Sequence, residues 1–355
     1  MPYRVVGASA PRVDGVGKAT GETAFLSDLR LPGMLFGRLL RSPHAHARIR
    51  AIDTSRASSL PGVKAVITAK DTPRIKFGFY PHLSDKLPIC ADRVRFMGDE
   101  VAAVAAVDRE RAEEALELIR VDYEELPAVF TLEEAMAEGA PLVHEDKPGN
   151  VAWEICRSFG DPERVLSACP VVVEGEFQTQ RACHCPLETR HVIAHWDRSG
   201  RLTLYASTQT PHVLRQEVAR TLGIPSSRVR VIKPPTGGAF GNRLVMDMSI
   251  PIAALLAERT GRPVHMANSR EEEFSISRTR YSHRLYLRTG VARDGRILAR
   301  TANLFVDNGA YNDKGPATLS LRPTVALRPW PFGRGGCGSG GAVESLPEAF
   351  PTKAG

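Results

Sequence analysis

The sequence has little of several features that would define a simpler class of protein. Aromatic residues make up only 6% of its 355 residues. No stretch approaches the roughly 18 consecutive apolar residues that a membrane-spanning helix needs. Residues 1–7 are not followed by an apolar segment of signal-peptide length. We therefore expect neither a membrane partner nor export, and we predict a cytoplasmic location.

A strong excess of one charge is also missing. The sequence has 47 Lys and Arg against 40 Asp and Glu, a formal net charge of +7. No dense basic block alternates with aromatic residues, as many nucleic-acid-binding surfaces show. This balance is typical of a solvated surface. A nucleic-acid partner is thus the least favoured alternative.

Paired metal-ligand motifs are absent. The six cysteines are dispersed, and none forms a Cys-x-x-Cys pair. In a strand, Cys183 and Cys185 would point to the same face. A reduced structural role is favoured for them, with metal or redox chemistry, or a Cys/His nucleophile, as alternatives. His44 and His46 would likewise share a strand face, but no third ligand lies nearby in the sequence. No metal ligand is assigned.

Apolar periodicity divides the chain into two units. In the first, residues 12–130, strands are expected at 34–40, 63–68 and 100–107, with a helix over 109–120 that Asp108 caps. Strands and helices do not alternate strictly, which predicts an α+β fold rather than a doubly wound sheet. Residues 131–150 contain Gly- and Pro-rich segments and are predicted to be a linker.

The second unit, residues 151–320, has its own pattern of strands and helices. The expected elements are strands at 171–177 and 229–232, hairpins at 191–206 and 288–306, and helices over 211–222 and 249–260. Ser249 is a candidate N-cap for the last helix, and Ser269-x-x-Glu272 has the spacing of a capping box. Residues 321–355 are rich in Gly and Pro without a period, which predicts a non-native or disordered tail that does not pack.

Two segments could contribute to a ligand site. Gly-Gly-Ala-Phe-Gly at 237–241 lies between a strand and a helix, where glycines allow backbone N–H groups to approach a ligand closely. It lacks the Lys and Ser/Thr of a phosphate loop. Gln209, at the end of a strand, has an amide that can both donate and accept a hydrogen bond. Taken separately, each segment is more often part of an ordinary turn.

Together, the motifs resemble the molybdenum hydroxylase family, the large subunits of xanthine dehydrogenase, aldehyde oxidoreductase and aerobic carbon monoxide dehydrogenase type. Four segments resemble that family's α/β hammerhead domain: Gly-Lys-Ala-Thr-Gly at 17–21, Ser-Pro-His-Ala-His-Ala-Arg at 42–48, Pro-Gly-Val at 61–63 and Gly-Asp-Glu-Val-Ala-Ala-Val at 98–104. Four more resemble the first part of its molybdopterin-binding domain: Cys-Pro-Leu-Glu-Thr at 185–189, Ser-Thr-Gln at 207–209, residues 237–241 and Val-Asp-Asn-Gly-Ala-Tyr at 306–311.

The resemblance implies a cofactor, a site and partners. The cofactor would be molybdenum held by molybdopterin, which oxidises a C–H bond of an aldehyde, an aromatic heterocycle or a similar small molecule, or oxidises CO. Electrons would pass to an iron–sulfur small subunit and an FAD medium subunit. The cofactor-binding residues carried over from the family are Gln209, Gly237, Gly238, Phe240 and Gly241.

The sequence departs from the family in two ways. Purine-oxidising members have a glutamate where this chain has Leu244, so purines are not the expected substrate. Gly-Asn-Arg at 241–243 and Pro-Leu-Glu-Thr at 186–189 are closer to the carbon monoxide dehydrogenase and hydroxybenzoyl-CoA reductase branches. The family's glutamate base lies in a C-terminal region that this sequence lacks, so no catalytic residue is assigned. The alternative to an enzyme portion is an inactive fragment or a split-subunit assembly module.

Overall fold

One seven-stranded mixed sheet takes strands from both halves of the sequence. The computed structural model describes residues 6–7, 9–316, 340–343 and 348–349. The strand order is β13, β12, β11, β14, β1, β5, β3. Their bounds, in the same order, are Val229–Ile232, Leu202–Ala206, His191–Trp196, Val264–Ala267, Leu35–Arg41, Glu100–Ala106 and Val63–Thr68. The two units that the sequence separates therefore share one sheet.

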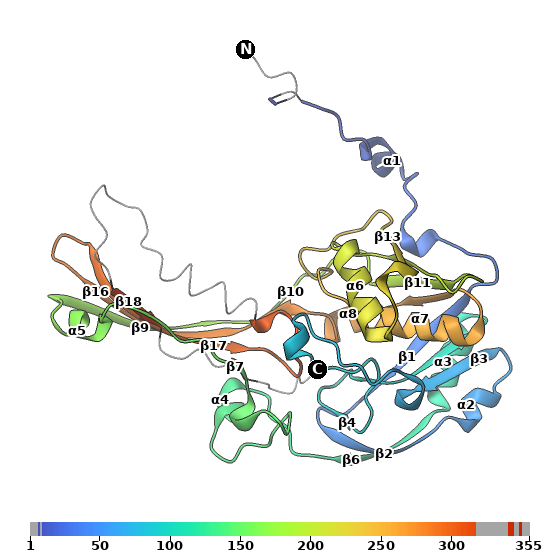
Figure 1. Cartoon of the computed structure of the whole chain (residues 1–355), viewed down its shortest axis with the longest axis horizontal. Coiled ribbons are helices and arrows are strands. Elements are labelled where there is room, and N and C mark those ends of the chain that lie inside the picture. Colours follow the sequence, from blue (N-terminus) through green and yellow to red (C-terminus); the bar gives the residue numbers. More distant parts are fainter. Residues whose placement is uncertain (1–5, 8, 317–339, 344–347, 350–355) are drawn as a thin grey trace.

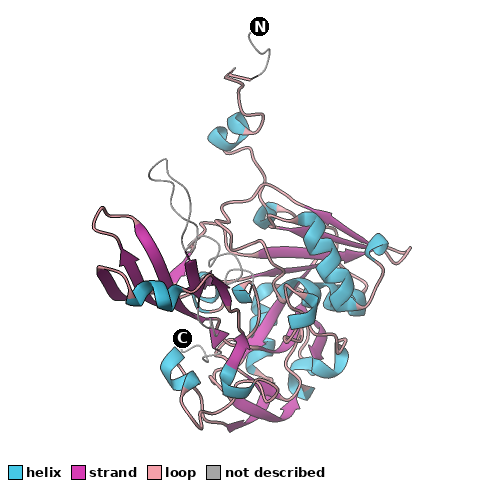
Figure 2. Ribbon diagram, turned by 60° about the vertical axis from the view of Figure 1, so that its left-hand side comes forward, coloured by secondary structure: helices cyan, strands magenta, loops and turns pink. Residues whose placement is uncertain are grey.

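Helices cover both faces of this sheet (Figures 1 and 2). On β5, Ala103 and Ala105 belong to the core that includes α6 and α7, whereas Ala102 and Val104 pack with α2 and α3. Neighbouring residues of a strand point to opposite faces, so every side chain of β5 is buried. The helices are α2 (Ser55–Ser59), α3 (Arg109–Glu117), α6 (Pro211–Leu222) and α7 (Ser249–Thr260).

A second large sheet forms an arm that extends from the body (Figure 1). Its long strands are β9, β16 and β17, and β16 pairs antiparallel with both neighbours. The turn between β16 and β17 contains Asp294 and Gly295, as the sequence predicts. The arm's elements are β7 (Val151–Trp153), β8 (Arg157–Phe159), α5 (Pro162–Ser167), β9 (Val171–Thr179), β16 (His283–Val291), β17 (Ile297–Asp307), β18 (Gly340–Val343) and β19 (Glu348–Ala349).

The remaining elements are short. A three-stranded sheet contains β4 (Arg93–Val94), β2 (Ala47–Asp53) and β6 (Arg120–Glu125), and β10 (Ala182–Cys183) pairs with β15 (Thr279–Arg280). The other α-helices are α1 (Gly15–Thr20), α4 (Leu132–Met136) and α8 (Arg270–Ser275). The 3-10 helices are η1 (Leu26–Asp28), η2 (Ala69–Asp71), η3 (Pro81–Leu83), η4 (Pro148–Asn150) and η5 (Ser226–Arg228). No helix in the part of the chain that the structure describes is long and apolar enough to cross a membrane.

The helix caps and helix ends that were predicted from residues close together in the sequence are confirmed. The Asp108 side chain accepts a hydrogen bond from the Arg111 N–H at 2.7 Å, which caps α3. Gly223 ends α6 in the left-handed conformation. Ser269 and Glu272 form the predicted capping box of α8. The α+β fold class is confirmed as well.

One local prediction is wrong, and two arrangements that would require a strand do not occur. Ser249 is not an N-cap: it is the first residue of α7, and its N–H donates to the Asp247 carboxylate at 3.0 Å. Cys183 and Cys185 do not share a strand face, because β10 ends at Cys183 and Cys185 has a φ of +45°. His44 and His46 lie in a bend rather than in a strand. The ring nitrogen Nδ1 of His46 lies 2.6 Å from the Pro127 carbonyl oxygen.

The predicted tail also contains described strands. β18 and β19 pair with β17, so the expectation that nothing after residue 321 packs does not hold for them. They add to an existing strand and therefore need no apolar period of their own. The other residues of the tail lie outside the described part of the chain. The limits 12–130, 131–150 and 151–320 stay a prediction.

The shared sheet predicts how a nicked chain behaves. Glu138 lies in the exposed stretch of the expected linker, so cleavage by a Glu-specific protease should occur there. The two fragments should stay together in gel filtration, since β1 pairs with β14 across the nick, and should separate only in denaturant. Fragments that part under native conditions would contradict the shared sheet.

Candidate functional site

One edge of the large sheet collects the segments that the sequence analysis singled out. β12 and β13 are parallel, β11 is antiparallel to β12, and β14 is antiparallel to β11. The ends of β12, β13 and β14 therefore lie at the same edge as the start of β11. This site edge carries residues 185–190, 207–210, 233–248 and 268–273.

At the site edge, Gln209 contacts the glycine loop, residues 237–241. The Gln209 side-chain oxygen accepts hydrogen bonds from the N–H of Gly241 at 3.1 Å and of Arg243 at 3.4 Å. The backbone N–H of Gln209 donates to the Arg243 carbonyl at 3.0 Å. The oxygen is thus engaged, whereas no described residue accepts a hydrogen bond from the amide nitrogen. Gln209 itself is exposed.

The glycine loop has a backbone that few residue types could adopt. Gly238 and Gly241 have φ values of +106° and +93°, and Phe240 has a φ of +50° although it is not a glycine. A Cβ on Gly237 would lie 2.6 Å from the Glu188 Cβ, so that position has no room for a side chain. The loop therefore holds its N–H groups in a fixed arrangement, at a cost in backbone strain at Phe240.

A buried ion pair fastens this loop. Glu188 accepts from the Arg243 guanidinium at 2.6 Å and from the Gly237 N–H at 2.7 Å. Its other oxygen accepts from the Ser207 hydroxyl at 3.0 Å. The exposed fraction of the side chain is 8% for Glu188 and 1% for Arg243. One carboxylate therefore ties together three segments of the site edge.

A second buried network adjoins the first. Arg190 donates to the Asp247 carboxylate at 2.9 Å and to the Asn242 carbonyl at 2.6 Å. The Asn242 amide in turn donates to Glu273 at 3.2 Å. Burial alone would raise the pKa of Asp247, but the charge of Arg190 and a hydrogen bond from Ser249 hold it below its usual range.

The first unit reaches the same edge through Arg41. β1 is parallel to β14 and antiparallel to β5, so it ends at the site edge where β5 begins. There the Arg41 guanidinium lies 3.2 Å from the Glu100 carboxylate and 2.9 Å from that of Glu272. Arg41 therefore connects the first unit to α8.

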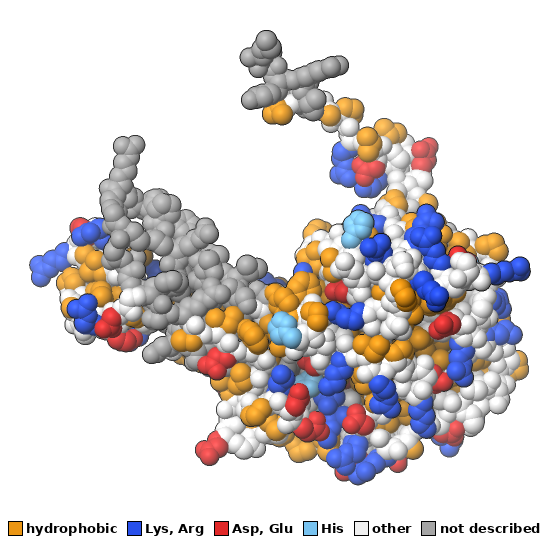
Figure 3. Space-filling model, viewed as in Figure 1, with side chains coloured by type: hydrophobic (Ala, Val, Ile, Leu, Met, Phe, Trp, Pro, Cys, Tyr) orange, Lys and Arg blue, Asp and Glu red, His pale blue; other side chains and the backbone are white. Residues whose placement is uncertain are grey.

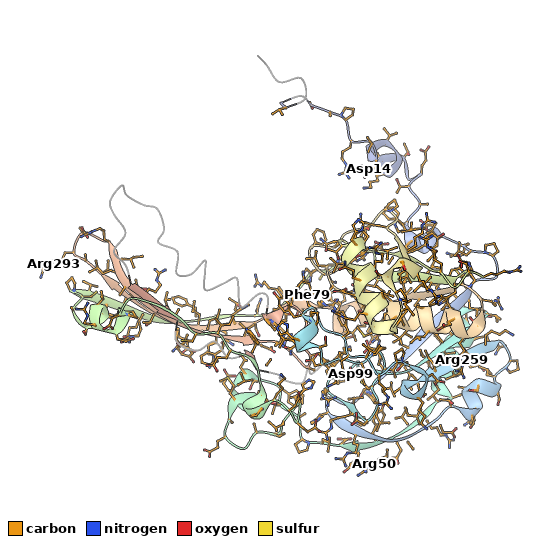
Figure 4. All side chains as sticks on the ribbon, viewed as in Figure 1. Asp14, Arg50, Phe79, Asp99, Arg259 and Arg293 are labelled. Atoms are coloured by element: carbon orange, nitrogen blue, oxygen red, sulfur yellow. The ribbon has the colours of Figure 1, made fainter. Side chains whose placement is uncertain are left out.

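Buried polar groups also fill the contact between the two units (Figure 4, near the label of Asp99). Asp99 accepts from the Tyr311 hydroxyl at 2.8 Å, and burial raises its pKa while the charge of Lys86 opposes that rise. A cavity of about 120 Å³ lies beside them, lined in part by Lys86, Glu100 and Asn312. These groups join residues 86–100 to the end of β17 and the segment that follows it.

Large apolar side chains remain exposed around the glycine loop. This apolar rim consists of Leu187, Phe240 and Phe274, whose exposed fractions are 91%, 72% and 54%. Arg270 holds two of them close together, because it donates to the Leu187 carbonyl and lies over the Phe274 ring. Phe240 and Pro186 both lie beside Gly238. A cluster of this kind usually marks a surface that another element covers.

The sequence analysis singled out Gln209 and the glycine loop, which the structure brings into contact, but it missed the residues that hold them. Glu188 and Arg243 were noted only as parts of motifs, and Arg190, Asp247 and Glu273 not at all. A useful signal was available. Arg243 and Asp247 flank the apolar run Leu-Val-Met, a context in which a charge is buried only when it is paired.

The geometry defines an α+β protein in which two units share one sheet and a glycine loop lies at its edge, and comparisons with known proteins identify its family. Residues 143–329 match the model of the molybdopterin cofactor-binding domain. Residues 20–127 match that of the aldehyde oxidase and xanthine dehydrogenase a/b hammerhead domain. The chain belongs to this family of molybdopterin-dependent oxidoreductases.

Comparisons with individual proteins support the same family. The chain is 38% identical to a probable xanthine dehydrogenase component of Bacillus subtilis, with 91% of this chain and 43% of that protein aligned. It is 36% identical to the nicotinate dehydrogenase large molybdopterin subunit of Eubacterium barkeri, with 92% and 76% aligned. The crystal structure of quinoline 2-oxidoreductase from Pseudomonas putida 86 matches with a TM-score of 0.89 and 30% identity, over 99% of this chain and 45% of that one. The chain thus spans less than half the length of two of these three proteins.

The buried pair predicts a large loss of stability in Glu188→Ala. The change leaves the Arg243 charge buried without its partner, which should lower the free energy of unfolding by about 3–5 kcal/mol, measured by urea denaturation. Glu174→Ala is the matched control, because Glu174 pairs with Arg288 at 2.9 Å in solvent, and it should have a much smaller effect. Equal effects would mean that Glu188 does not fasten the loop.

The raised pKa of Glu217, which lies in α6, predicts that the stability of the chain depends on pH. It accepts from the Met246 N–H at 3.0 Å, and burial raises its pKa from 4.5 to about 7. The folded chain then binds more protons than the unfolded chain between these values, so stability falls as the pH rises. Between pH 4.5 and about pH 8, the free energy of unfolding of the wild-type chain should fall by about 3 kcal/mol through this group. Glu217→Gln should remove that fall. The exposed Glu258→Gln should leave the wild-type dependence unchanged, and a similar curve for all three proteins would contradict the assignment.

Proposed function

We propose that this chain is the N-terminal portion of the molybdopterin-binding large subunit of a molybdenum hydroxylase. The complete enzyme would oxidise a C–H bond of an aldehyde, an aromatic heterocycle or a similar small molecule, or oxidise CO. The contact between Gln209 and Gly241 is the observation that carries this proposal, because it brings the two family motifs together at one edge.

The residues at the site edge fit such a cofactor. Among the residues that the structure describes, none accepts a hydrogen bond from the Gln209 amide nitrogen, whose N–H groups remain available to a ligand oxygen. A Cβ on Gly241 would meet nothing closer than 3.9 Å, so the backbone is open at this position. Neutral donors beside open backbone suit an oxygen-bearing group without adding charge.

The proposed roles follow from these contacts. The molybdenum–pterin group, when bound, supplies the redox chemistry. Gln209 would donate a hydrogen bond to it, and Gly237, Gly238, Phe240 and Gly241 would line its binding surface. Glu188 and Arg243 are positioning residues that act through the loop. Leu244 offers no group that could hydrogen-bond a purine, and no residue of this chain is assigned as the base.

The exposed apolar rim supports a site that another region covers. Leu187, Phe240 and Phe274 would be covered by the region that longer relatives possess. The Eubacterium barkeri protein shows that length varies among the relatives. Its alignment of 330 residues covers 76% of that protein, whereas 323 residues cover only 43% of the Bacillus subtilis one. A large molybdopterin subunit can therefore be much shorter than the Bacillus subtilis protein. An inactive fragment is the alternative.

The proposed partners are an iron–sulfur subunit and an FAD subunit, to which electrons would pass. Relatives that are themselves named as subunits of larger enzymes support the existence of such partners. A cytoplasmic location remains a prediction from the sequence.

Reconstitution tests the proposal. Purified alone, the chain should contain far less than stoichiometric molybdenum, since only one side of the site is present. Co-expressed with a chain that carries the missing C-terminal region, it should retain molybdenum and pterin and reduce a dye with an aldehyde or aromatic substrate. Gln209→Ala should lower that activity roughly a hundredfold while molybdenum is retained.

Two outcomes would contradict the proposal. A chain that is fully loaded and active by itself would refute the incomplete site, and an assembled complex without molybdenum would refute the function. Gln216→Ala, an exposed change on α6, is the matched control and should keep full activity.

A further inference from the structure

A group of basic side chains surrounds a hollow at the outer edge of the large sheet. This basic hollow has a volume of about 310 Å³. Four of the residues that line it are cationic, Arg201, Arg215, Arg230 and Lys233, and the others are Pro211, His212, Val229 and Val231. Figure 3 shows Lys and Arg side chains, with scattered acidic ones, on the face where Figure 1 places α6 and β13.

These four cations form no ion pair, unlike many arginines in the part of the chain that the structure describes. Arg288 pairs with Glu163 and Glu174, and Arg41 with two carboxylates. Within the described residues, no acidic side chain forms an ion pair with any of the four cations of the basic hollow. The Nε atom of Arg215 is moreover buried without a hydrogen-bond partner. Like charges that share a hollow repel one another, so a bound anion would relieve that repulsion.

The hollow lies along a free strand edge. β13 is the first strand of the sheet and pairs only with β12 among the described strands. Alternate N–H and C=O groups of an edge strand point away from its neighbour and can pair with another extended chain. Basic residues on an edge strand can also serve only to prevent aggregation. A single charge would be enough for that purpose, and it would not require a hollow.

We propose that the basic hollow and the edge of β13 bind an acidic, extended segment of another protein chain. The segment would add a strand to β13 through backbone hydrogen bonds, and its carboxylates would pair with the four cations. Nucleic acid fits less well, because no Phe, Tyr or Trp lines the hollow to stack on a base.

The position of the hollow gives this binding a consequence. Lys233 lies four positions before Gly237, and Pro211 lies two positions after Gln209. A segment bound here would therefore lie next to both loops of the candidate cofactor site. The proposal does not depend on the cofactor, since it rests on charge and on a free edge.

A defined peptide tests the proposal on the full chain. The probe is fluorescein-labelled Glu-Val-Glu-Val-Glu-Val-Glu, and binding is measured by fluorescence anisotropy. We expect binding that weakens with added salt and that is weakened about tenfold or more by Arg230→Glu combined with Lys233→Glu. Arg293→Glu is the matched control, since Arg293 lies at the far tip of the arm (Figure 4), and it should leave binding unchanged.

A second peptide separates strand pairing from simple charge attraction. The same sequence with alternate backbone nitrogens methylated keeps every carboxylate but loses half of its N–H donors, and it should bind about tenfold more weakly. Circular dichroism of each variant verifies folding. The proposal is overturned if the wild-type chain does not bind the probe, if the methylated peptide binds equally well, if Arg293→Glu weakens binding as much as the double variant, or if oligothymidylate of the same length binds more tightly.

Discussion

Every buried charge at the site edge must find a partner, and the candidate site depends on this constraint. A carboxylate such as Glu188 can be buried only if several donors reach it. Those donors come from Ser207, Gly237 and Arg243, which lie on two other segments of the chain. The ion pair therefore decides where the glycine loop lies and, through the Arg243 backbone, where Gln209 lies. The loop geometry is a consequence of pairing that takes place beneath it.

Strand direction makes this pairing possible. Segments that are far apart in the sequence meet because β12, β13 and β14 end at the edge where β11 begins. β1 and β5 bring the first unit to the same edge, where Arg41 lies between Glu100 and Glu272. The hammerhead unit is thus part of the sheet that forms the site and not a separate attachment. A change in it can reach the site through the shared strands.

The sequence predicted those features that near neighbours determine. The Asp108 cap, the end of α6 at Gly223 and the Ser269 capping box all depend on contacts within four residues, so their signals are local. Motif resemblance then located Gln209 and residues 237–241. The pairing of Glu188 with Arg243 spans 55 positions, and no pattern in a single sequence specifies it. Ser249 shows the limit even of local rules, because Asp247 supplies the oxygen that a capping serine would have supplied.

Two kinds of open surface on this chain favour two kinds of partner. A partner that buries the apolar rim of Leu187, Phe240 and Phe274 gains about 25 cal/mol of binding free energy per Å² of apolar surface. Salt does not screen this contribution. Such a surface suits a cover that stays in place, as the second half of a cofactor site must. The basic hollow beside β13 relies on charges that salt does screen, and charge pairing mainly increases association rates and selectivity. A segment bound there can exchange while the rim remains covered. If both proposals hold, the site edge would separate a permanent contact, which completes the site, from a reversible one at its flank.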